Sequence, residues 1–238
     1  MVRGLTHAAQ ALIPRMRQQD AIAHNLANVE TPAFKGERIL VDRVASGDGS
    51  LGAPPERILL RQHTDFSPAS LSSTGNPMDL AVEGEGFLVV RTDHGLRLSR
   101  GGNFRVAEDG RWYNPAGHVL QSQTGDLLSD PDLPPPAVAA DGSTEDGQRL
   151  WLARVPRPSA LSREGAGTYR WPHDLSSLPD ATGTMIRSGH REGSNVSAMT
   201  EVSSMMQVFR AYEAAQRALE IQAETVRTAV ERVGRVGK

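Results

Sequence analysis

Scattered histidines and one short glycine turn are the residues of this 238-residue chain whose types could do chemistry. No two of the seven histidines are four residues apart, and none forms the H-E-x-x-H pattern that places two zinc ligands on one helix face. We therefore expect single surface histidines and no metal site. Gly84-Glu85-Gly86 lacks the spacing, the lysine and the following helix of a phosphate loop, so it indicates a tight turn between strands.

Serine and acid chemistry find no better arrangement. No serine lies in the G-x-S-x-G sequence that forms a nucleophile elbow. Glu83 and Glu85 resemble an acid pair, but they flank the glycines of a turn, where we expect them to be solvated. The sequence therefore predicts no catalytic residue, no cofactor and no enzyme activity.

The composition excludes further classes of site. The chain has no cysteine, so disulfides and thiolate metal sites are ruled out. The formal net charge of −2 gives no general attraction to nucleic acid or anionic lipid. No apolar run approaches the roughly 20 residues that span a bilayer, and His7, Pro14 and Arg15 interrupt what would be the apolar part of a signal peptide. We expect no membrane insertion and no cleaved signal.

The elements that position the remaining residues begin with two helical seams, one at each end of the chain. Apolar and small residues recur alternately every four and three residues, the spacing that keeps one stripe of a helix facing a partner. The N-terminal seam comprises Leu5, Ala9, Leu12, Met16, Gln19, Ala23 and Leu26. The C-terminal seam comprises Val202, Met205, Phe209, Tyr212, Gln216, Leu219, Ala223, Val226, Val230 and Val233.

Between the seams, short apolar runs alternate with turn signals about every ten residues. Phe87–Arg91 reads as a buried strand, and Asp93-His94-Gly95 as a hairpin turn after it. We predict an α+β chain in which the terminal helices form an antiparallel coiled-coil rod segment with an inserted, mainly antiparallel β domain. The expected divisions are 1–35 and 193–238 for the helical parts, 36–65 for an extended segment and 66–192 for the β domain.

Two polar residues within the seams leave two interpretations open. Gln19 and Gln216 either lie at solvated ends of the seams or act as a buried polar pair that fixes the register of a coiled coil. A different class of function is suggested by residues 18–34, which imitate a helix-turn-helix. The absence of a basic recognition helix argues against DNA binding there.

Three segments, in order along the chain, resemble the flagellar rod and hook family. The first is His24–Val29 (HNLANV) followed by Thr31–Lys35 (TPAFK), with Ala33 where the family usually has glycine. The second is Thr74–Phe87 (TGNPMDLAVEGEGF), continued by Arg100–Phe104. The third is Glu192–Val196 (EGSNV), followed by RAYEA at 210–214. The chain length and the single modest β domain are most similar to the proximal rod members, and a distal rod member or another hook and basal-body member is the alternative.

The resemblance implies a structural axial subunit of the bacterial flagellar rod, which polymerises helically and carries torque between basal ring and hook. Its partners would be further copies, other axial proteins and, in transit, the flagellar type III export apparatus, with no nucleic acid. It would lie in the basal body, crossing the periplasm. The expected assembly interface comprises the two seams and the corner after the first helix: Leu5, Leu12, Met16, Gln19, Ala23, Asn25, Leu26, Asn28, Val202, Met205, Phe209, Tyr212, Gln216, Leu219, Val226 and Val230.

Overall fold

The computed structural model describes residues 2–44 and 57–236 and forms two compact units. The helical unit comprises Met1–Ala27, Gly36–Asp65 and Val196–Lys238. The β unit comprises Asn28–Lys35 and Phe66–Asn195. Each unit is therefore assembled from segments that are far apart in the sequence.

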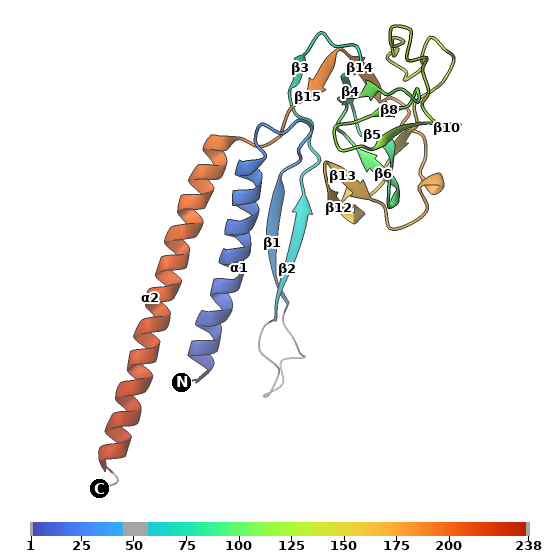
Figure 1. Cartoon of the computed structure of the whole chain (residues 1–238). Coiled ribbons are helices and arrows are strands. Elements are labelled where there is room, and N and C mark those ends of the chain that lie inside the picture. The colour runs from blue at the N-terminus through green and yellow to red at the C-terminus, as the bar shows by residue number, and fades with distance from the viewer. Residues whose placement is uncertain (1, 45–56, 237–238) are drawn as a thin grey trace. The chain divides into compact units, whose positions relative to one another are not determined.

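The helical unit contains two helices and a hairpin (Figure 1). Helix α1 (Val2–Ala27) continues through Pro14, and helix α2 (Ala198–Val236) is longer. Strand β1 (Glu37–Val44) pairs antiparallel with β2 (Arg57–Thr64), with Glu37 opposite Thr64. Residues 18–34 contain only the end of α1 and no second helix, so the helix-turn-helix interpretation is wrong.

The predicted antiparallel coiled coil of the terminal helices is also wrong. The chain has two helices of unequal length and a mostly antiparallel β body, and the predicted seams do not form a packed pair. Among the α1 residues from Leu12 onward, whose side chains are described, the buried positions are Pro14, Ala21 and Asn25, while Met16 and Ala23 of the predicted seam are exposed. Heptad spacing shows that a helix has one stripe suited to packing. It does not show which surface covers that stripe.

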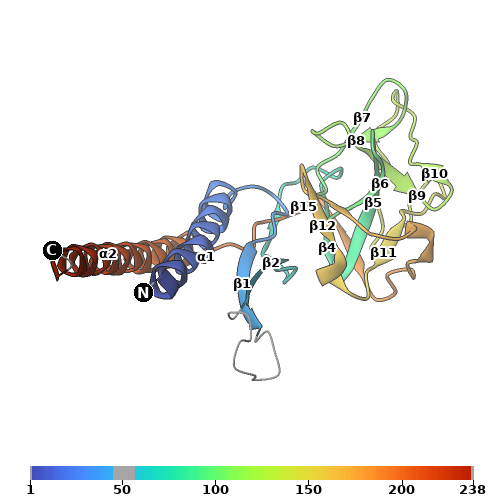
Figure 2. The same ribbon diagram turned by 90° about the horizontal axis from the view of Figure 1, so that it is seen from below.

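The second helix gives the same result more strongly. No residue of α2 whose side chain the structure describes is buried, and Phe209 of the predicted seam is 50% exposed. Although α1 and α2 lie beside each other (Figures 1 and 2), α1 also packs on β1. The contact side of α1 is thus shared between a helix and a strand, which a two-helix coiled coil does not allow.

The β unit is built around one large antiparallel sheet. Its main order is β12-β13-β6-β5-β9-β8-β7, with β10 beside β9 and β11 beside β5. The bounds are β5 (Gly86–Thr92), β6 (Gly95–Ser99), β7 (Arg105–Val106), β8 (Trp112–Tyr113), β9 (Val119–Ser122), β10 (Gly125–Asp126), β11 (Leu152–Arg154), β12 (Ser162–Gly165) and β13 (Thr168–Arg170). Two short 3₁₀ turns lie at Pro158–Ala160, between β11 and β12, and at Leu175–Ser177, after β13.

Two further strand pairs complete this unit. Strand β4 (Leu80–Glu83) pairs with β14 (Met185–Ser188), and β3 (Leu71–Ser73) pairs with β15 (His190–Glu192). Both pairs are antiparallel and join the start of the β unit to its end. The last strands of the unit therefore lie beside the first, and β15 leads towards α2.

Strand β5 organises the core because both of its faces are covered. Successive side chains of a strand point to opposite faces. Leu88 and Val90 belong to one buried apolar cluster, and Phe87 and Val89 belong to another. The prediction of a buried strand here is confirmed, as is the turn after it, since Thr92 pairs with Gly95. Among the described helices, neither is long and apolar enough to cross a membrane.

Candidate assembly surfaces and a buried ion cluster

An apolar face of α2 is left exposed by the other residues that the structure describes. Met199, Val202, Met206 and Phe209 follow one another by three or four residues and therefore share one side of the helix. Their exposed fractions are 81%, 41%, 55% and 50%. A surface helix normally turns such a stripe towards a core. This face is therefore a candidate surface for another protein chain.

The residues predicted for the assembly interface differ in exposure. Asn25 is buried, and Leu5 and Val230 lie where the side chains are not described. The exposed members are Met16, Ala23, Val202, Phe209 and Gln216. The half-buried members are Leu12, Gln19, Leu26, Asn28, Met205, Tyr212, Leu219 and Val226. Their exposure in the single chain therefore differs along both helices, and the assembly interface stays a prediction.

The two glutamines of the seams lie in different surroundings. Gln216 is exposed, and its amide donates to the Tyr212 hydroxyl of its own helix at 3.3 Å. Gln19 is half-buried on α1. The Gln216 amide therefore has a hydrogen-bond partner within α2. The interpretation of a buried polar pair required a coiled coil, which the helices do not form.

Asn25 fastens the end of α1 to the start of β1. Its amide nitrogen donates to the Glu37 carbonyl at 2.9 Å, and its amide oxygen accepts from the Glu37 N–H at 2.8 Å. Both groups are buried. An amide side chain can donate and accept at the same time, so Asn25, the first asparagine of the HNLANV segment, has a defined local role.

A groove lies between α1, β1 and α2 within the helical unit. Its volume is about 450 Å³, and it is lined by apolar residues such as Ile22, Ile39 and Val208 and by charged ones such as Arg15 and Glu201. Ala21, at the wall of this groove, is buried. The groove adds a concave, mixed surface beside the exposed face of α2.

The most unusual feature of the β unit is a fully buried ion cluster of Lys35, Arg100 and Glu192. Their exposed fractions are 0%, 2% and 2%. Lys35 Nζ lies 2.8 Å from Glu192 Oε1 and donates to the Ser67 carbonyl at 2.8 Å. Arg100 Nε donates to Glu192 Oε2 at 3.1 Å. Lysine, arginine and glutamate are almost never fully buried unless they are paired, as they are here.

Arg100 also holds the glycine turn between β4 and β5. Its Nη1 donates to the carbonyls of Gly84 and Gly86 at 2.8 and 3.0 Å, and its Nη2 donates to Val82 at 3.0 Å. The predicted tight turn at Gly84–Gly86 is thus confirmed, and its carbonyls face a cation, not a phosphate. The flanking Glu83 is half-buried and pairs with Arg187, and Glu85 is exposed and pairs with Arg154.

The cluster joins three segments that are distant in the sequence. Lys35 ends the TPAFK segment, Arg100 begins the continuation of the second motif, and Glu192 begins the third. The backbone follows the same path, since Ala33 N donates to the Glu192 carbonyl at 2.8 Å. All three residues belong to the motifs described from the sequence, but no role was predicted for any of them. The feature that could have indicated them is that each is a charged residue at the edge of its motif.

Ala33 explains one departure from the family pattern. Its φ angle is +54°, in the left-handed region that side chains with a Cβ rarely adopt. Glycine adopts this conformation without steric cost. The family's usual glycine at this position therefore fits the backbone that the structure shows. Here the alanine is held by its buried surroundings and by its bond to Glu192.

The shifted pKa values among the described residues have structural causes. Hydrogen bonds from the hydroxyl and N–H of Ser143 lower the pKa of Asp141, and those of Ser176 lower the pKa of Asp174 in the same way. Burial raises the pKa of Asp126, but hydrogen bonds from Gln121 and Arg91 outweigh it, so that this pKa is lowered. These carboxylates fasten turns and strand ends. No group of three histidine or acidic residues in the described parts could hold a metal ion.

Comparison with known proteins agrees with this layout. A family described as flagellar basal body rod FlgEFG protein, C-terminal, matches residues 187–232, which begin just before Glu192. FlgF of Caulobacter vibrioides, a flagellar basal-body rod protein, is 31% identical over 92% of this chain and 93% of its own length. This chain belongs to the flagellar basal-body rod protein family. Its function is that of a structural subunit of the rod.

Other members of the rod protein family give the same assignment. FlgF of Mesorhizobium japonicum is 29% identical, covering 87% of both chains. FlgG of Bacillus subtilis, also a basal-body rod protein, is 25% identical, covering 90% of this chain and 92% of its own length. The resemblance found in the three motifs is thereby confirmed. A FlgG-like assignment has no better support than the FlgF-like one.

Proposed function

We propose that this chain is a proximal, FlgF-like subunit that polymerises helically with further copies and with other axial proteins to transmit torque from the basal ring to the hook. The observation that carries the proposal is the exposed apolar face of α2. A soluble chain that functioned alone would leave that face in water at a cost of about 25 cal/mol per Å² of apolar surface. Contact with neighbouring subunits removes this cost.

The assembly interface that we propose includes the exposed members of the two seams. Phe209 and Val202 would pack against neighbouring subunits, and Met16 and Ala23 of α1 would offer a second contact. We further propose that the chain reaches the periplasm through the flagellar type III export apparatus without a cleaved signal. The family assignment supports this route.

Replacing Phe209 by aspartate tests the proposed interface. If Phe209 is buried between subunits, the carboxylate must be buried without a partner, which costs several kcal/mol. We expect loss of swimming and loss of this protein from purified basal bodies. Because Phe209 is half exposed in the single chain, its thermal unfolding should change little.

The matched control is Glu220→Lys, a charge change at an exposed position of the same helix. This variant should assemble and swim like the wild type. Normal motility of the Phe209→Asp strain would remove this face of α2 from the assembly mechanism.

A further inference from the structure

The β unit carries a pocket with more positive than negative side chains. This pocket, of about 310 Å³, is lined by Asn76, Asp79, Asn103, Arg105, Tyr113 and Arg191, together with Phe104 and Pro115. Arg191 Nη2 donates to Asp79 Oδ2 at 2.9 Å, so these two charges compensate each other. Arg105 on β7 is exposed, and its side chain has no acidic partner or hydrogen bond among the described residues. The pocket therefore has one net positive charge.

Two further details make this pocket suited to an acceptor. The Nε–H of Arg191 is buried without a hydrogen-bond partner among the described groups, and such a donor is costly to leave unpaired. The remaining acid near the pocket, Asp109, accepts from the Tyr113 hydroxyl and pairs with Arg111 at 3.4 Å. An incoming carboxylate would therefore meet the guanidinium of Arg105, whose charge no described acid compensates.

A turn on the same β unit presents a pair of acids with no basic partner. Glu145 and Asp146 occupy the centre of a turn closed by the bond from Gly147 N to the Thr144 carbonyl at 3.0 Å. Both are exposed, and neither forms an ion pair among the described residues. By contrast, the exposed acids Glu85 and Glu164 both pair with arginines.

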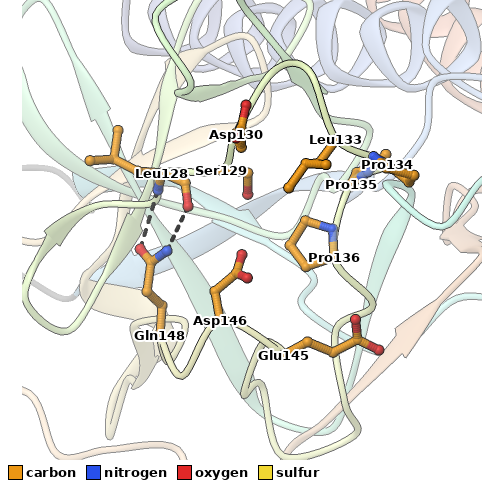
Figure 3. A pocket seen from close by; sticks show the side chains of 10 residues that line it. All are labelled: Leu128, Ser129, Asp130, Leu133, Pro134, Pro135, Pro136, Glu145, Asp146 and Gln148. Atoms are coloured by element: carbon orange, nitrogen blue, oxygen red, sulfur yellow. Dashed lines mark hydrogen bonds between the residues drawn. The ribbon is translucent and has the colours of Figure 1, made fainter.

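This acidic turn is held firmly in place. Figure 3 shows the side chain of Gln148 bonded to both backbone groups of Leu128, donating to the carbonyl at 2.5 Å and accepting from the N–H at 3.2 Å. Glu145, Asp146 and the exposed Leu133 line the open pocket beside it (Figure 3). A turn fixed before binding loses less conformational entropy when it docks.

We propose that the acidic turn Thr144–Gly147 of one subunit docks in the basic pocket at Arg105 and Arg191 of a second copy. The pocket and the acidic turn are different patches of the same β unit. A contact between two different patches of identical subunits is head-to-tail, the kind that builds open helical polymers. The proposal rests on the proposed rod function.

Charge reversal and its rescue test the contact. Arg105→Glu alone, or Glu145→Lys with Asp146→Lys, should place like charges together and reduce the copies recovered in basal bodies at least tenfold. Combining the three changes restores opposite charges and should restore most of the recovery. The controls are Arg157→Glu and Asp93→Lys, which reverse exposed charges outside both patches and should assemble normally. Unchanged thermal unfolding of each variant shows that it still folds.

Cross-linking gives a second measurement that does not depend on the strength of the contact. Because the chain has no cysteine, Arg105→Cys with Asp146→Cys introduces the only two thiols. A short bismaleimide should join these subunits into dimers and larger products in isolated basal bodies, while Arg157→Cys with Asp146→Cys should not react in this way.

Each failure has a distinct meaning. If the wild type is found in basal bodies but the charge variants assemble normally and no cross-link forms, the rod function stands and this contact is wrong. If Arg105→Glu fails to assemble while the acidic-turn variant assembles normally, the pocket binds another axial protein and the second copy is excluded. Absence of the wild-type protein from basal bodies would overturn the proposed function itself.

Discussion

At the scale of single residues, the charges that matter most in this chain are the ones hidden from solvent. Glu192 receives both Lys35 and Arg100 within hydrogen-bond distance, and all three are nearly inaccessible. A buried ion pair contributes little compared with an apolar replacement of the whole group, but removing one partner leaves an uncompensated charge. The cluster therefore makes the junction of three segments sensitive to any single change.

Glu192→Gln should destabilise the β unit by about 3–5 kcal/mol, because two buried cations lose the carboxylate that both of them contact. The side chain keeps its size, so the effect reports charge and not volume. Urea unfolding of the full chain, followed by the near-ultraviolet signal of the buried Trp112 and Tyr169, measures the loss.

The matched control is Glu85→Gln, the same chemical change at an ion pair in which Glu85 is 79% exposed. Exposed pairs typically contribute about 0–1 kcal/mol, so this variant should unfold like the wild type. Equal stability of the two variants would show that the buried cluster is not coupled to folding.

At the scale of elements, the sequence predicted individual segments better than their packing. The turn at Gly84–Gly86, strand β5 and the two terminal helices follow from glycine placement, a short apolar run and heptad spacing. The coiled-coil prediction was wrong because the buried side chains described on α1, Pro14, Ala21 and Asn25, are small or polar. The regular spacing of larger side chains indicated a different stripe of the helix. The ion cluster could not be predicted because its three members are up to 157 residues apart.

Asn25→Asp should weaken the attachment of α1 to β1. Aspartate can still accept from the Glu37 N–H, but it cannot donate to the Glu37 carbonyl, which is buried and would lose its partner. Leaving a buried polar group unpaired costs about 1–3 kcal/mol. We expect faster amide exchange in β1 and in the last turn of α1, measured by hydrogen–deuterium exchange on the purified chain.

Gln19→Glu makes the same amide-to-acid change on α1 at a half-buried position without a described hydrogen bond. It should leave exchange in β1 unchanged. Faster exchange in both variants would mean that added negative charge, and not the lost donor, loosens the helix.

At the scale of the whole molecule, both compact units are discontinuous in the sequence. The β unit takes in Asn28–Lys35, which lies before the hairpin, as well as Phe66–Asn195. Lys35 and Phe34 belong to its interior, and Arg163 stacks over the Phe34 ring at 4.5 Å from the centroid. A division based on sequence runs alone, with the β domain at 66–192, separates these residues from their partners.

A fragment of residues 28–195 should therefore unfold cooperatively and at a higher temperature than a fragment of residues 66–195. Both contain every strand from β3 to β15, but the shorter one lacks Lys35, so that Glu192 loses one of the two cations it contacts. It also exposes the surface that Ala33 and Phe34 cover, at a cost of about 25 cal/mol per Å² of apolar area. Thermal circular dichroism of the two fragments measures the difference. A third fragment, 28–195 with Lys35→Met, should fall between them, because it restores the apolar cover without the cation. Equal melting temperatures for all three would show that the β unit folds without the segment that follows α1.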